Sequence, residues 1–515
     1  MSTTTELRSA MLLHADDDVA IATGDLAAAA PVTVGGELLT ARDAVMRGHK
    51  IAVRRRDVGE PVLRYGQIIG FATCPIEVGD HVHTHNLEFQ TFERDYEFAR
   101  GAQGVSLLPA DQRATFEGIV RPDGRIATRN YIGILTTVNC SATAAKHIAD
   151  AFRRPGLLDA FPNVDGVVAL THTTGCAMAP DGDGLKLLRR TLTGYAKHPN
   201  FFGFILVGLG CETNQVRELA EAWEVDPATV VSSMTIQDQG GTAATVREGV
   251  SRIQAMLPEA NEATRETVPA SELVLAAECG GSDAYSGITA NPGLGAAVDL
   301  VVANGGTAVW GETPEIYGAE HLLTRRATTP EVGKALVDRI RWWEEYTRIN
   351  GGTLDNNPSP GNKEGGLTTI LEKSLGAVAK GGTTDLMAVY EFAEEITAKG
   401  MVFMDTPGYD PVSVTGMVAG GANVVAFTTG RGSAFGCKPV PSMKLATNTE
   451  MYERMTDDMD INCGVVVDDD EVDIPEMGRR IFDLVLATAS GKLTKSEELG
   501  FGGEEFVPWQ LGAVM

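Results

Sequence analysis

The feature that most constrains the fold is a series of short apolar runs, each ending in a loop rich in Gly, Cys, Asn or Thr. The run "VDGVVAL" leads into "HTTGCAMAPDGDG" at residues 172–184, and "FGFILVGLGCETNQ" and "ELVLAAECGGSD" repeat the arrangement. Amphipathic segments such as "SATAAKHIADAF" lie between the runs. Strands that alternate with helices in this way are typical of α/β domains with a mainly parallel sheet.

The chain divides into parts that differ in their pattern of apolar, polar and turn residues. Residues 1–92 contain short alternating runs such as "VAIATGDL", separated by turn residues, which predicts a small β-rich module. Residues 93–115 show no sustained period and are expected to be a linker. The α/β alternation then predicts a middle unit over 116–265 and a second α/β unit over 266–515. The polar stretch "PEANEATRETVPA", at 258–270, is expected to contain no strand and to mark the boundary between them.

Length and charge exclude several classes of protein. A chain of 515 residues is expected to form two to four domains with large cores. The net charge of −26 disfavours nucleic acids and anionic membranes as partners, although a local basic cluster can still bind an anionic substrate. No apolar stretch approaches the roughly 20 residues of a membrane span, and the start lacks the pattern of a signal peptide. The seven dispersed cysteines argue against a disulfide framework, so we expect a cytoplasmic protein.

The loops that follow the strands are the expected place for a site, because ligands of open α/β sheets bind beyond the carboxyl ends of the strands. The loop "ECGGSDAYSGITANP" offers hydrogen-bonding side chains, and Cys176, Cys211 and Cys279 each follow an apolar run. Three thiols in equivalent positions favour a shared site; the alternative is that they are small buried hydrophobes. Neither "GLGCET" nor "NPGLGAAVD" is a dinucleotide fingerprint, which disfavours a dehydrogenase.

Charged and imidazole side chains gather in three further segments. In "GDHVHTHN", His81, His83 and His85 alternate, so on a strand they share one face, which suits a metal or an anion; the alternative is a strand end that faces solvent. In "NPSPGNKEGG", Lys363 is a candidate substrate-binding cation or base, unless the segment is an ordinary surface loop.

The third segment, "FTTGRGSAFGCKPVPSMKLATNTE", concentrates Arg431, Lys438 and Lys444 in an otherwise acidic protein. It is the best candidate for a carboxylate-binding patch, in which Arg431 suits a bidentate grip.

Taken together, these motifs resemble the altronate/galactarate dehydratases over nearly the whole chain, and the histidine run is more similar to the altronate-type branch. The segments that carry the resemblance are "GHKIAV", "GDHVHTHN", "DGRIATRN", "HTTGC", "GLGCETNQ", "ECGGSDAYSGITANP", "NPSPGNKEGG", "FTTGRG" and "KLATNTE". The resemblance implies an α/β protein with an N-terminal β-clip module, a middle domain used in homodimerisation and a C-terminal Rossmann-like domain with a metal. That organisation agrees with the parts of the chain distinguished above by their residue patterns.

The resemblance also implies β-elimination of water from a sugar acid such as altronate, giving a 2-keto-3-deoxy acid. Galactarate, another aldonate or aldarate, or a sulfonated hydroxy acid such as sulfolactate are alternative substrates, and a ligand-binding protein without catalysis is the alternative of another class. Elimination needs a base, an acid and stabilisation of an enediolate. The base and acid are expected among His172, Lys363, His83 and His85, without individual assignment; the expected substrate-binding residues are Arg431, Lys444, Ser282, Asp283 and Asn291. We expect His83 and His85 to reach from the N-terminal module into the α/β site and close it over substrate.

The metal implied by the resemblance is ferrous iron, with Mn²⁺ as a substitute. The sequence predicts that Cys176, Cys211 and Cys279 converge to hold it, either as a single ion or as a 4Fe–4S cluster with one open iron. Harder ligands, namely Asp283, Glu312 and His172, are the alternative.

Overall fold

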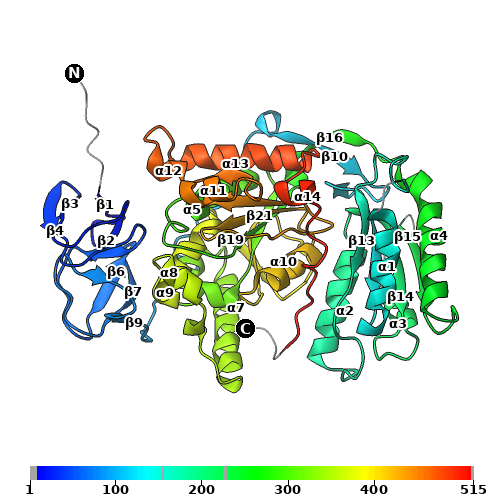
Figure 1. Ribbon diagram of the computed structural model, residues 1–515, viewed down its shortest axis with the longest axis horizontal. Helices are drawn as coiled ribbons and strands as arrows, with labels where there is room; N and C mark the ends of the chain where they lie inside the picture. Colours follow the sequence, from blue (N-terminus) through cyan, green and yellow to red (C-terminus); the bar gives the residue numbers. More distant parts are fainter. Residues whose placement is uncertain (1–8, 154–155, 224–228, 512–515) are drawn as a thin grey trace.

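Short strands build the N-terminal part of the chain. In the computed structural model, which describes residues 9–153, 156–223 and 229–511, this part is β-rich and forms a separate unit at one end of the molecule (Figure 1). Its strands are β1 (Ala10–Met11), β2 (Val19–Ala22), β3 (Pro31–Val34), β4 (Glu37–Thr40), β5 (Lys50–Ala52), β6 (Pro61–Arg64), β7 (Gln67–Ala72), β8 (His81–Val82) and β9 (Leu87–Glu88). They form a four-stranded sheet in the order β1-β2-β5-β8, the hairpin β3-β4 and a three-stranded sheet β6-β7-β9. We call residues 9–92 the N-terminal module.

The segment after the module, which the sequence predicts to be a linker, is pinned to the C-terminal part of the chain. The backbone amides of Ala99 and Gly101 donate to the carbonyl oxygens of Thr324 and Arg325 at 2.9 and 2.7 Å. Further along, the amide of Leu108 donates to the carbonyl oxygen of Ala303 at 2.8 Å. The segment therefore follows a fixed path and ends in the short helix η1 (Ala110–Gln112).

The middle part is the first of the two α/β units. Its sheet has the order β13-β12-β14-β15, and all of its pairings are parallel. The strands are β12 (Tyr131–Thr136), β13 (Gly166–Leu170), β14 (Phe201–Gly208) and β15 (Val230–Thr235); the helices are η2 (Asn139–Ser141), α1 (Ala142–Arg153), α2 (Asp183–Ala196), α3 (Val216–Ala222) and α4 (Thr242–Ala260). The apolar runs at β12, β13 and β14 are the ones from which the sequence predicts parallel strands.

A small antiparallel sheet connects this unit to the next, and here one expectation is wrong. The stretch 258–270 does contain a strand, β16 (Arg265–Pro269), which pairs with β10 (Thr115–Val120); β11 (Ile126–Ala127) completes the sheet. Within β16 Val268 is buried and Arg265 half-buried, whereas Glu266, Thr267 and Pro269 are exposed. Main-chain hydrogen bonds to β10 form this strand, and its sequence lacks the apolar pattern from which a strand is predicted.

The C-terminal part is built on a seven-stranded parallel sheet in the order β19-β20-β18-β17-β21-β22-β23. Every residue of β20 and β21 is buried, which shows that helices cover both faces of the sheet. The strands are β17 (Val274–Cys279), β18 (Thr307–Trp310), β19 (Leu386–Tyr390), β20 (Gly400–Met404), β21 (Val424–Thr429), β22 (Ser442–Ala446) and β23 (Ile461–Asn462).

Helices of very different lengths surround this sheet (Figure 1). They are η3 (Ala270–Glu272), α5 (Ala290–Ala303), η4 (Thr313–Ile316), α6 (His321–Thr324), α7 (Pro330–Ile349), η5 (Leu354–Asn356), α8 (Pro360–Glu364), α9 (Ile370–Ala377), η6 (Val378–Gly381), α10 (Asp410–Ala419), α11 (Thr449–Arg454), α12 (Val465–Asp468), α13 (Ile474–Ala489) and α14 (Lys495–Glu498). Of the described helices, none is long and apolar enough to cross a membrane.

Candidate functional site

The carboxyl ends of β17 and β18 carry a buried cluster of ionisable side chains. Cys279 is the last residue of β17, and Glu312 follows β18. The ammonium group of Lys380 donates to the thiol sulfur of Cys279 at 2.9 Å and to Oε2 of Glu312 at 2.7 Å. All three side chains are almost completely buried. Burial raises the pKa of Cys279 well above its usual value, so Lys380 finds its charge partner in Glu312.

The backbone at Glu312 is strained. Its φ of 67° and ψ of 60° lie in the left-handed region, which a residue with a side chain rarely adopts. The amide of Glu312 donates to Oγ1 of Thr406 at 2.6 Å, which helps to hold this conformation. Such strain costs about 1–3 kcal/mol and concentrates at functional sites. It is the first indication that the loop after β18 has a role beyond packing.

A cavity of about 420 Å³ opens beside this cluster. Lys373 of α9 points its ammonium group into the cavity wall, donating to Oε1 of Glu315 at 2.7 Å and to Oδ1 of Asn357 at 2.6 Å. Burial, and then the charges of Glu312 and Glu315, raise the pKa of Asp410 to about 7. The cavity is lined by Gly280, Gly281, Glu315, Asn357, Lys373 and Asp410, among others. It therefore offers a cation and a carboxyl group that can exchange a proton near neutral pH.

The glycine-rich loops that the sequence places after the strands meet beside this cavity. The side-chain amide of Asn362 donates to the carbonyl oxygen of Ser282 at 2.8 Å, and the backbone amide of Arg431 donates to the carbonyl oxygen of Gly281 at 2.9 Å. Asp283 is buried and accepts hydrogen bonds from Thr447, Ser286 and Asn448. Asp283 therefore holds the loops in place, while the side chain of Arg431 remains about half exposed and lies 3.4 Å from the carboxylate of Glu364 in α8.

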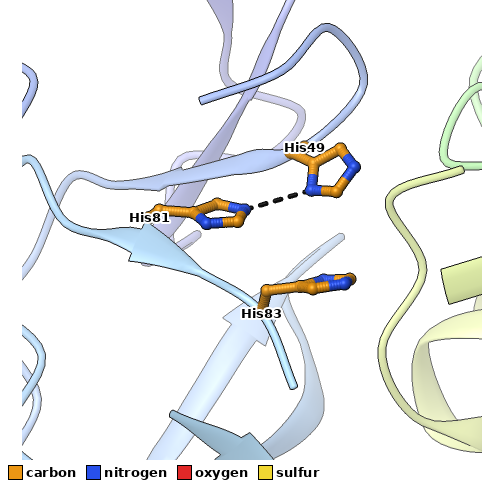
Figure 2. Close-up of side chains that lie close together, drawn as sticks. All are labelled: His49, His81 and His83. Atoms are coloured by element: carbon orange, nitrogen blue, oxygen red, sulfur yellow. Dashed lines mark hydrogen bonds between the residues drawn. The ribbon is translucent and has the colours of Figure 1, made fainter. Parts of the chain in front are cut away.

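The histidines of the N-terminal module lie on the side that faces α8 (Figure 2). In the antiparallel pair β5–β8, Lys50 lies opposite Val82 and Ile51 opposite His81, so continuing the register places His49 opposite His83. His81 and His83 share a face because side chains alternate along a strand. Nδ1 of His49 and Nε2 of His81 are 3.0 Å apart, and the ring centroids of His49 and His83 are 4.9 Å apart. We call His49, His81 and His83 the histidine trio.

The trio is held in its neutral form. Burial, together with the neighbouring imidazoles and the charge of Lys50, lowers the pKa of His81 to about 4 and that of His83 to about 3. Burial also lowers the pKa of His49. Three neutral imidazoles present three lone pairs at pH 7, which is the form that binds metal ions.

The docking of the module fixes the trio against the C-terminal part. Nε2 of His49 lies 3.2 Å from the carbonyl oxygen of Glu364. Gly366, at φ +97°, lets the backbones meet, because a Cβ there would lie 2.5 Å from the carbonyl oxygen of Gly48. Lys50 donates to both carboxylate oxygens of Glu372, at 3.0 and 2.9 Å, in a fully buried contact.

Two other predicted residues lie near the trio. His85 is exposed, and its ring centroid is 5.4 Å from that of His81. Lys363 belongs to α8, the short helix whose first turn lines the cavity and whose last carbonyl faces His49. A helix of five residues is about 7.5 Å long, so the cavity and the trio are close neighbours.

The structure does not bring the three predicted iron ligands together. Cys176 and Cys211 are exposed loop residues of the middle part, whereas Cys279 is buried in the C-terminal part. Among the described residues, the groups of potential ligands whose atoms lie within 4.8 Å of one another do not contain these three thiols as a set. The prediction assumed that all three strands belong to one sheet, but they belong to two sheets with separate carboxyl edges.

Other predicted site residues serve the fold instead. His172, of the middle part, is buried with Nε2 2.9 Å from the carbonyl oxygen of Thr136, and burial lowers its pKa to about 4. Lys444 is buried, and its ammonium group donates to the carbonyl oxygen of Phe435 at 2.8 Å. Asn291 donates to the carbonyl oxygen of Gly376 at 2.9 Å. None of the three is among the residues that line the cavity described above.

Only some of these groups fit the iron that the resemblance implies. The alternative set of Asp283, Glu312 and His172 is also not among the groups within ligand distance in the described chain. Two acidic groups are, namely Cys279 with Glu312 and Glu315, and Glu278 with Glu312 and Asp410. Both share Glu312, which Lys380 already neutralises. The histidine trio is the third group, and the nearby ammonium group of Lys50 is paired with Glu372.

Sequence reasoning missed His49, Lys373, Lys380 and Asp410. The signal for His49 was "GHK" at the start of a strand, but its partner strand lies thirty residues away. For the lysines the signal was two charges inside the apolar helical stretch "ILEKSLGAVAKGG". A lysine on a buried face needs a partner, which makes such positions candidates for a site.

The comparisons with known proteins agree with this arrangement. Three family models match successive parts of the chain: the altronate/galactarate dehydratase SAF domain at residues 8–90, the second domain of D-galactarate dehydratase/altronate hydrolase at 118–261, and the D-galactarate/altronate dehydratase C-terminal domain at 270–514.

Full-length relatives show the same likeness. An altronate dehydratase of Bacillus subtilis is 33% identical over 96% of this chain and 98% of its own length. A galactarate dehydratase (L-threo-forming) of Escherichia coli is 37% identical over 93% of this chain and 92% of its own. An altronate dehydratase of Escherichia coli is 34% identical over 95% of this chain and 97% of its own. The resemblance read from the motifs is thus confirmed, and the chain belongs to the altronate/galactarate dehydratase family.

Proposed function

We propose that this chain is a hydro-lyase that removes water from a sugar acid, an aldonate such as altronate, to give a 2-keto-3-deoxy acid. The observation that carries the proposal is the cavity at the carboxyl edge of the seven-stranded sheet, where Lys373, Glu315 and Asp410 line one space. A cavity of about 420 Å³ lies within the range of sites for small molecules. The names of the relatives support a sugar acid as the substrate.

The reaction makes three chemical demands. The C–H bond next to the carboxylate must lose its proton to a base, and the electron pair then forms the C=C bond of an enol. The neighbouring C–O bond breaks, and the departing hydroxide must receive a proton to leave as water. The enol finally gains a proton at carbon and becomes the keto acid. Negative charge builds up on the carboxylate in the first step, so fixed positive charge there lowers the barrier.

Residues of the cavity suit these demands. Asp410 is the proposed base, because a carboxyl group with a pKa of about 7 is partly ionised at neutral pH and still holds a proton well. Lys373 is the proposed acid for the leaving hydroxide, since its ammonium group has three donors and only two of them are used, by Glu315 and Asn357. Arg431, whose backbone amide bonds to Gly281 of the cavity wall, is proposed to bind the substrate carboxylate.

A divalent ion, when bound, adds Lewis acidity that stabilises the charge on the carboxylate and weakens the bond to the leaving hydroxyl. The residues described above supply the remaining parts of the chemistry, namely proton transfer and orientation. The strained loop at Glu312 and the buried Lys380 hold the floor of the cavity in a fixed shape.

The proposal includes the setting of the enzyme. We infer a β-clip N-terminal module and a Rossmann-like C-terminal domain, and a cytoplasmic homodimer that associates through the middle domain. The family match supports this organisation. Light scattering coupled to size-exclusion chromatography tests it: a species of twice the chain mass supports the dimer, and a monomer at micromolar concentration contradicts it.

The test of function is an anaerobic assay of the iron-loaded protein against a panel of altronate, other hexonates, galactarate and sulfolactate. We expect a 2-keto acid from an aldonate, with one solvent deuterium incorporated at carbon when the assay is run in D₂O. If only galactarate or only sulfolactate is turned over, that compound and not an aldonate is the substrate. Tight binding of a sugar acid without any turnover by folded, metal-loaded protein would instead indicate a binding protein.

A further inference from the structure

We propose that the histidine trio, His49, His81 and His83, is the seat of the enzyme's divalent metal ion. The inference rests on the proposed function for its chemical purpose, but its evidence is the geometry of the N-terminal module. It assigns the metal to a place different from the thiols that the sequence suggests and from the acidic cluster at the sheet edge.

The spacing of the nitrogen atoms carries the first step. Each residue of the trio offers a nitrogen, and these atoms lie within 4.8 Å of one another. Nδ1 of His49 and Nε2 of His81 are already 3.0 Å apart. Two nitrogens bound to one ion at about 2.1 Å lie roughly 3.0–3.4 Å apart, depending on the geometry. The pair therefore has the separation of two ligands of one ion without any movement of the backbone.

The state of the rings carries the second step. The carbonyl oxygen of Glu364 can only accept a hydrogen bond, so at 3.2 Å it places the proton of His49 on Nε2 and leaves the lone pair of Nδ1 directed at the trio. This is the arrangement in which an outer carbonyl orients a metal-binding imidazole. In the third ring, Nδ1 of His83 is buried and has no hydrogen-bond partner among the described residues. A buried nitrogen without a partner is a cost that a bound ion would remove.

The rigidity of the surroundings carries the third step. The side-chain amide of Asn86 donates to the carbonyl oxygen of His81 at 2.9 Å, and its Oδ1 accepts from the amide of His83 at 2.9 Å. Asn86 is itself buried, so this turn fixes His81 and His83 relative to each other. Three protein ligands are the number that a catalytic metal site supplies, whereas a closed structural site has four.

Imidazole nitrogen suits Fe²⁺, Mn²⁺, Co²⁺ and Zn²⁺, whereas Ca²⁺ and Mg²⁺ prefer oxygen. The site should therefore select transition metals. It also makes the N-terminal module part of the active enzyme: His81 lies on β8, His83 directly follows this strand, His49 directly precedes β5, and the C-terminal part contributes the carbonyl of Glu364, with the cavity one short helix away.

The test is metal binding by the full-length chain, measured without reference to turnover. Metal-free protein is titrated anaerobically with Mn²⁺ and with Co²⁺ in a calorimeter, and bound metal per chain is counted after gel filtration. We expect one tight site. We expect His49→Ala, His81→Ala and His83→Ala each to weaken it by more than the roughly 10–100-fold that loss of an outer-shell partner costs. His147→Ala, at an exposed histidine of α1, is the matched control and should bind as the wild type does.

A spectroscopic readout separates nitrogen from oxygen ligands. With Cu²⁺ as the probe, pulsed electron paramagnetic resonance should show the modulation of the remote imidazole nitrogen, and each alanine variant should reduce it. Asp410→Asn and Glu315→Gln, in the acidic cluster, should leave both the affinity and this signal unchanged. Unchanged binding in all three histidine variants, together with loss of the ion in Asp410→Asn or Glu315→Gln, would overturn the assignment.

The outcomes for site and function are distinct. Suppose that the wild type binds one ion, that the histidine variants lose it, and that no substrate of the panel is turned over. This result would contradict the proposed function but support the metal site. Metal-dependent turnover that is unchanged in the three histidine variants would support the proposed function and contradict the metal site at the trio.

Discussion

Glu372 and Lys373 are consecutive residues of α9, yet their charges serve two different parts of the molecule. The carboxylate of Glu372 accepts from Lys50 and Arg64 of the N-terminal module, whereas the ammonium group of Lys373 contacts Glu315 in the wall of the cavity. Successive side chains on a helix point about 100° apart, so one turn of α9 can face both neighbours. The docking of the module and the geometry of the proposed site are thus fixed by the same helix.

Glu372→Gln should loosen the module. The change leaves Lys50 and Arg64 buried without a counter-charge, and breaking a buried pair in this way costs about 3–5 kcal/mol. Urea unfolding should show this loss in the free energy of unfolding. Glu221→Gln removes an exposed partner of Arg217 and serves as the control, for which we expect no measurable change. An unchanged urea midpoint in Glu372→Gln would contradict the assigned role.

The contacts of Glu372 with Lys50 and Arg64 also predict that the free energy of unfolding falls at acidic pH. Burial alone would raise the pKa of Glu372, but attraction from Lys50 and Arg64 lowers it to about 2. An unfolded glutamate titrates at about 4.3. Since the folded pKa is the lower one, the stabilisation is fully present above about pH 4.3 and is lost as the pH falls toward 2. The difference in stability between wild type and Glu372→Gln should therefore shrink across this window; a difference that grows on acidification would refute the reasoning.

Lys373→Met should abolish most of the activity while the protein stays folded. Methionine keeps much of the side chain's volume but cannot donate a proton, and general acid catalysis contributes roughly 10²–10⁴-fold. We expect kcat to fall by that factor with a smaller change in KM. Metal content should be unaffected, because the histidine trio lies in another part of the chain. A normal kcat in Lys373→Met would exclude it as the acid.

Asp410 should set the lower limb of the pH–rate profile. Burial, with the charges of Glu312 and Glu315, raises its pKa to about 7, and the base must be ionised to accept a proton. The rate should accordingly rise with pH, with a midpoint near 7, and level off above it. Asp410→Asn should lose this limb along with most of the activity. Retention of both the limb and the rate by the asparagine variant would assign the base elsewhere.

Arg431 and Lys444 should respond differently to substitution, although the sequence groups them in one basic patch. Arg431 is about half exposed and its backbone bonds to Gly281 of the cavity wall, so Arg431→Ala should cost about 2–4 kcal/mol of binding or transition-state stabilisation, measured as a fall in kcat/KM. Lys444 is buried against the carbonyl oxygen of Phe435, so Lys444→Met should change the urea midpoint more than KM. Arg431→Ala with unchanged kcat and KM would remove it from the site.

The cysteine variants should separate one thiol from the other two. Cys176→Ser and Cys211→Ser alter exposed residues of the middle part and should keep metal content and activity. Cys279→Ser replaces the sulfur that accepts from Lys380, which should reduce activity but spare the metal. Anaerobic metal analysis with parallel assays checks both. Loss of iron in all three variants would restore the thiols as ligands.

Local sequence patterns predicted what is local in this structure. Apolar runs identified β12, β13, β14, β17, β18, β20 and β21, and alternation placed His81 and His83 on one face, because these features depend on neighbours within a few residues. His49 joins them only through the antiparallel register of β5 and β8, and this pairing cannot be predicted from the local sequence. The three thiols follow similar strands but lie in two sheets, and only the topology of the sheets separates them. The exposed strand β16 carries almost no apolar signal at all.

The pinned segment that follows the module has a consequence for assembly. A free chain of that length would let the module search a wide volume before it docked. Hydrogen bonds at Ala99, Gly101 and Leu108 instead hold the segment along its route, so the entropy of that search is lost once, when the segment folds onto the C-terminal part. The module is then presented to α9 at a high effective concentration, and even a modest interface suffices to keep it closed. A protease cut within 93–108 should accordingly leave the two pieces associated under native conditions and let them part only in denaturant.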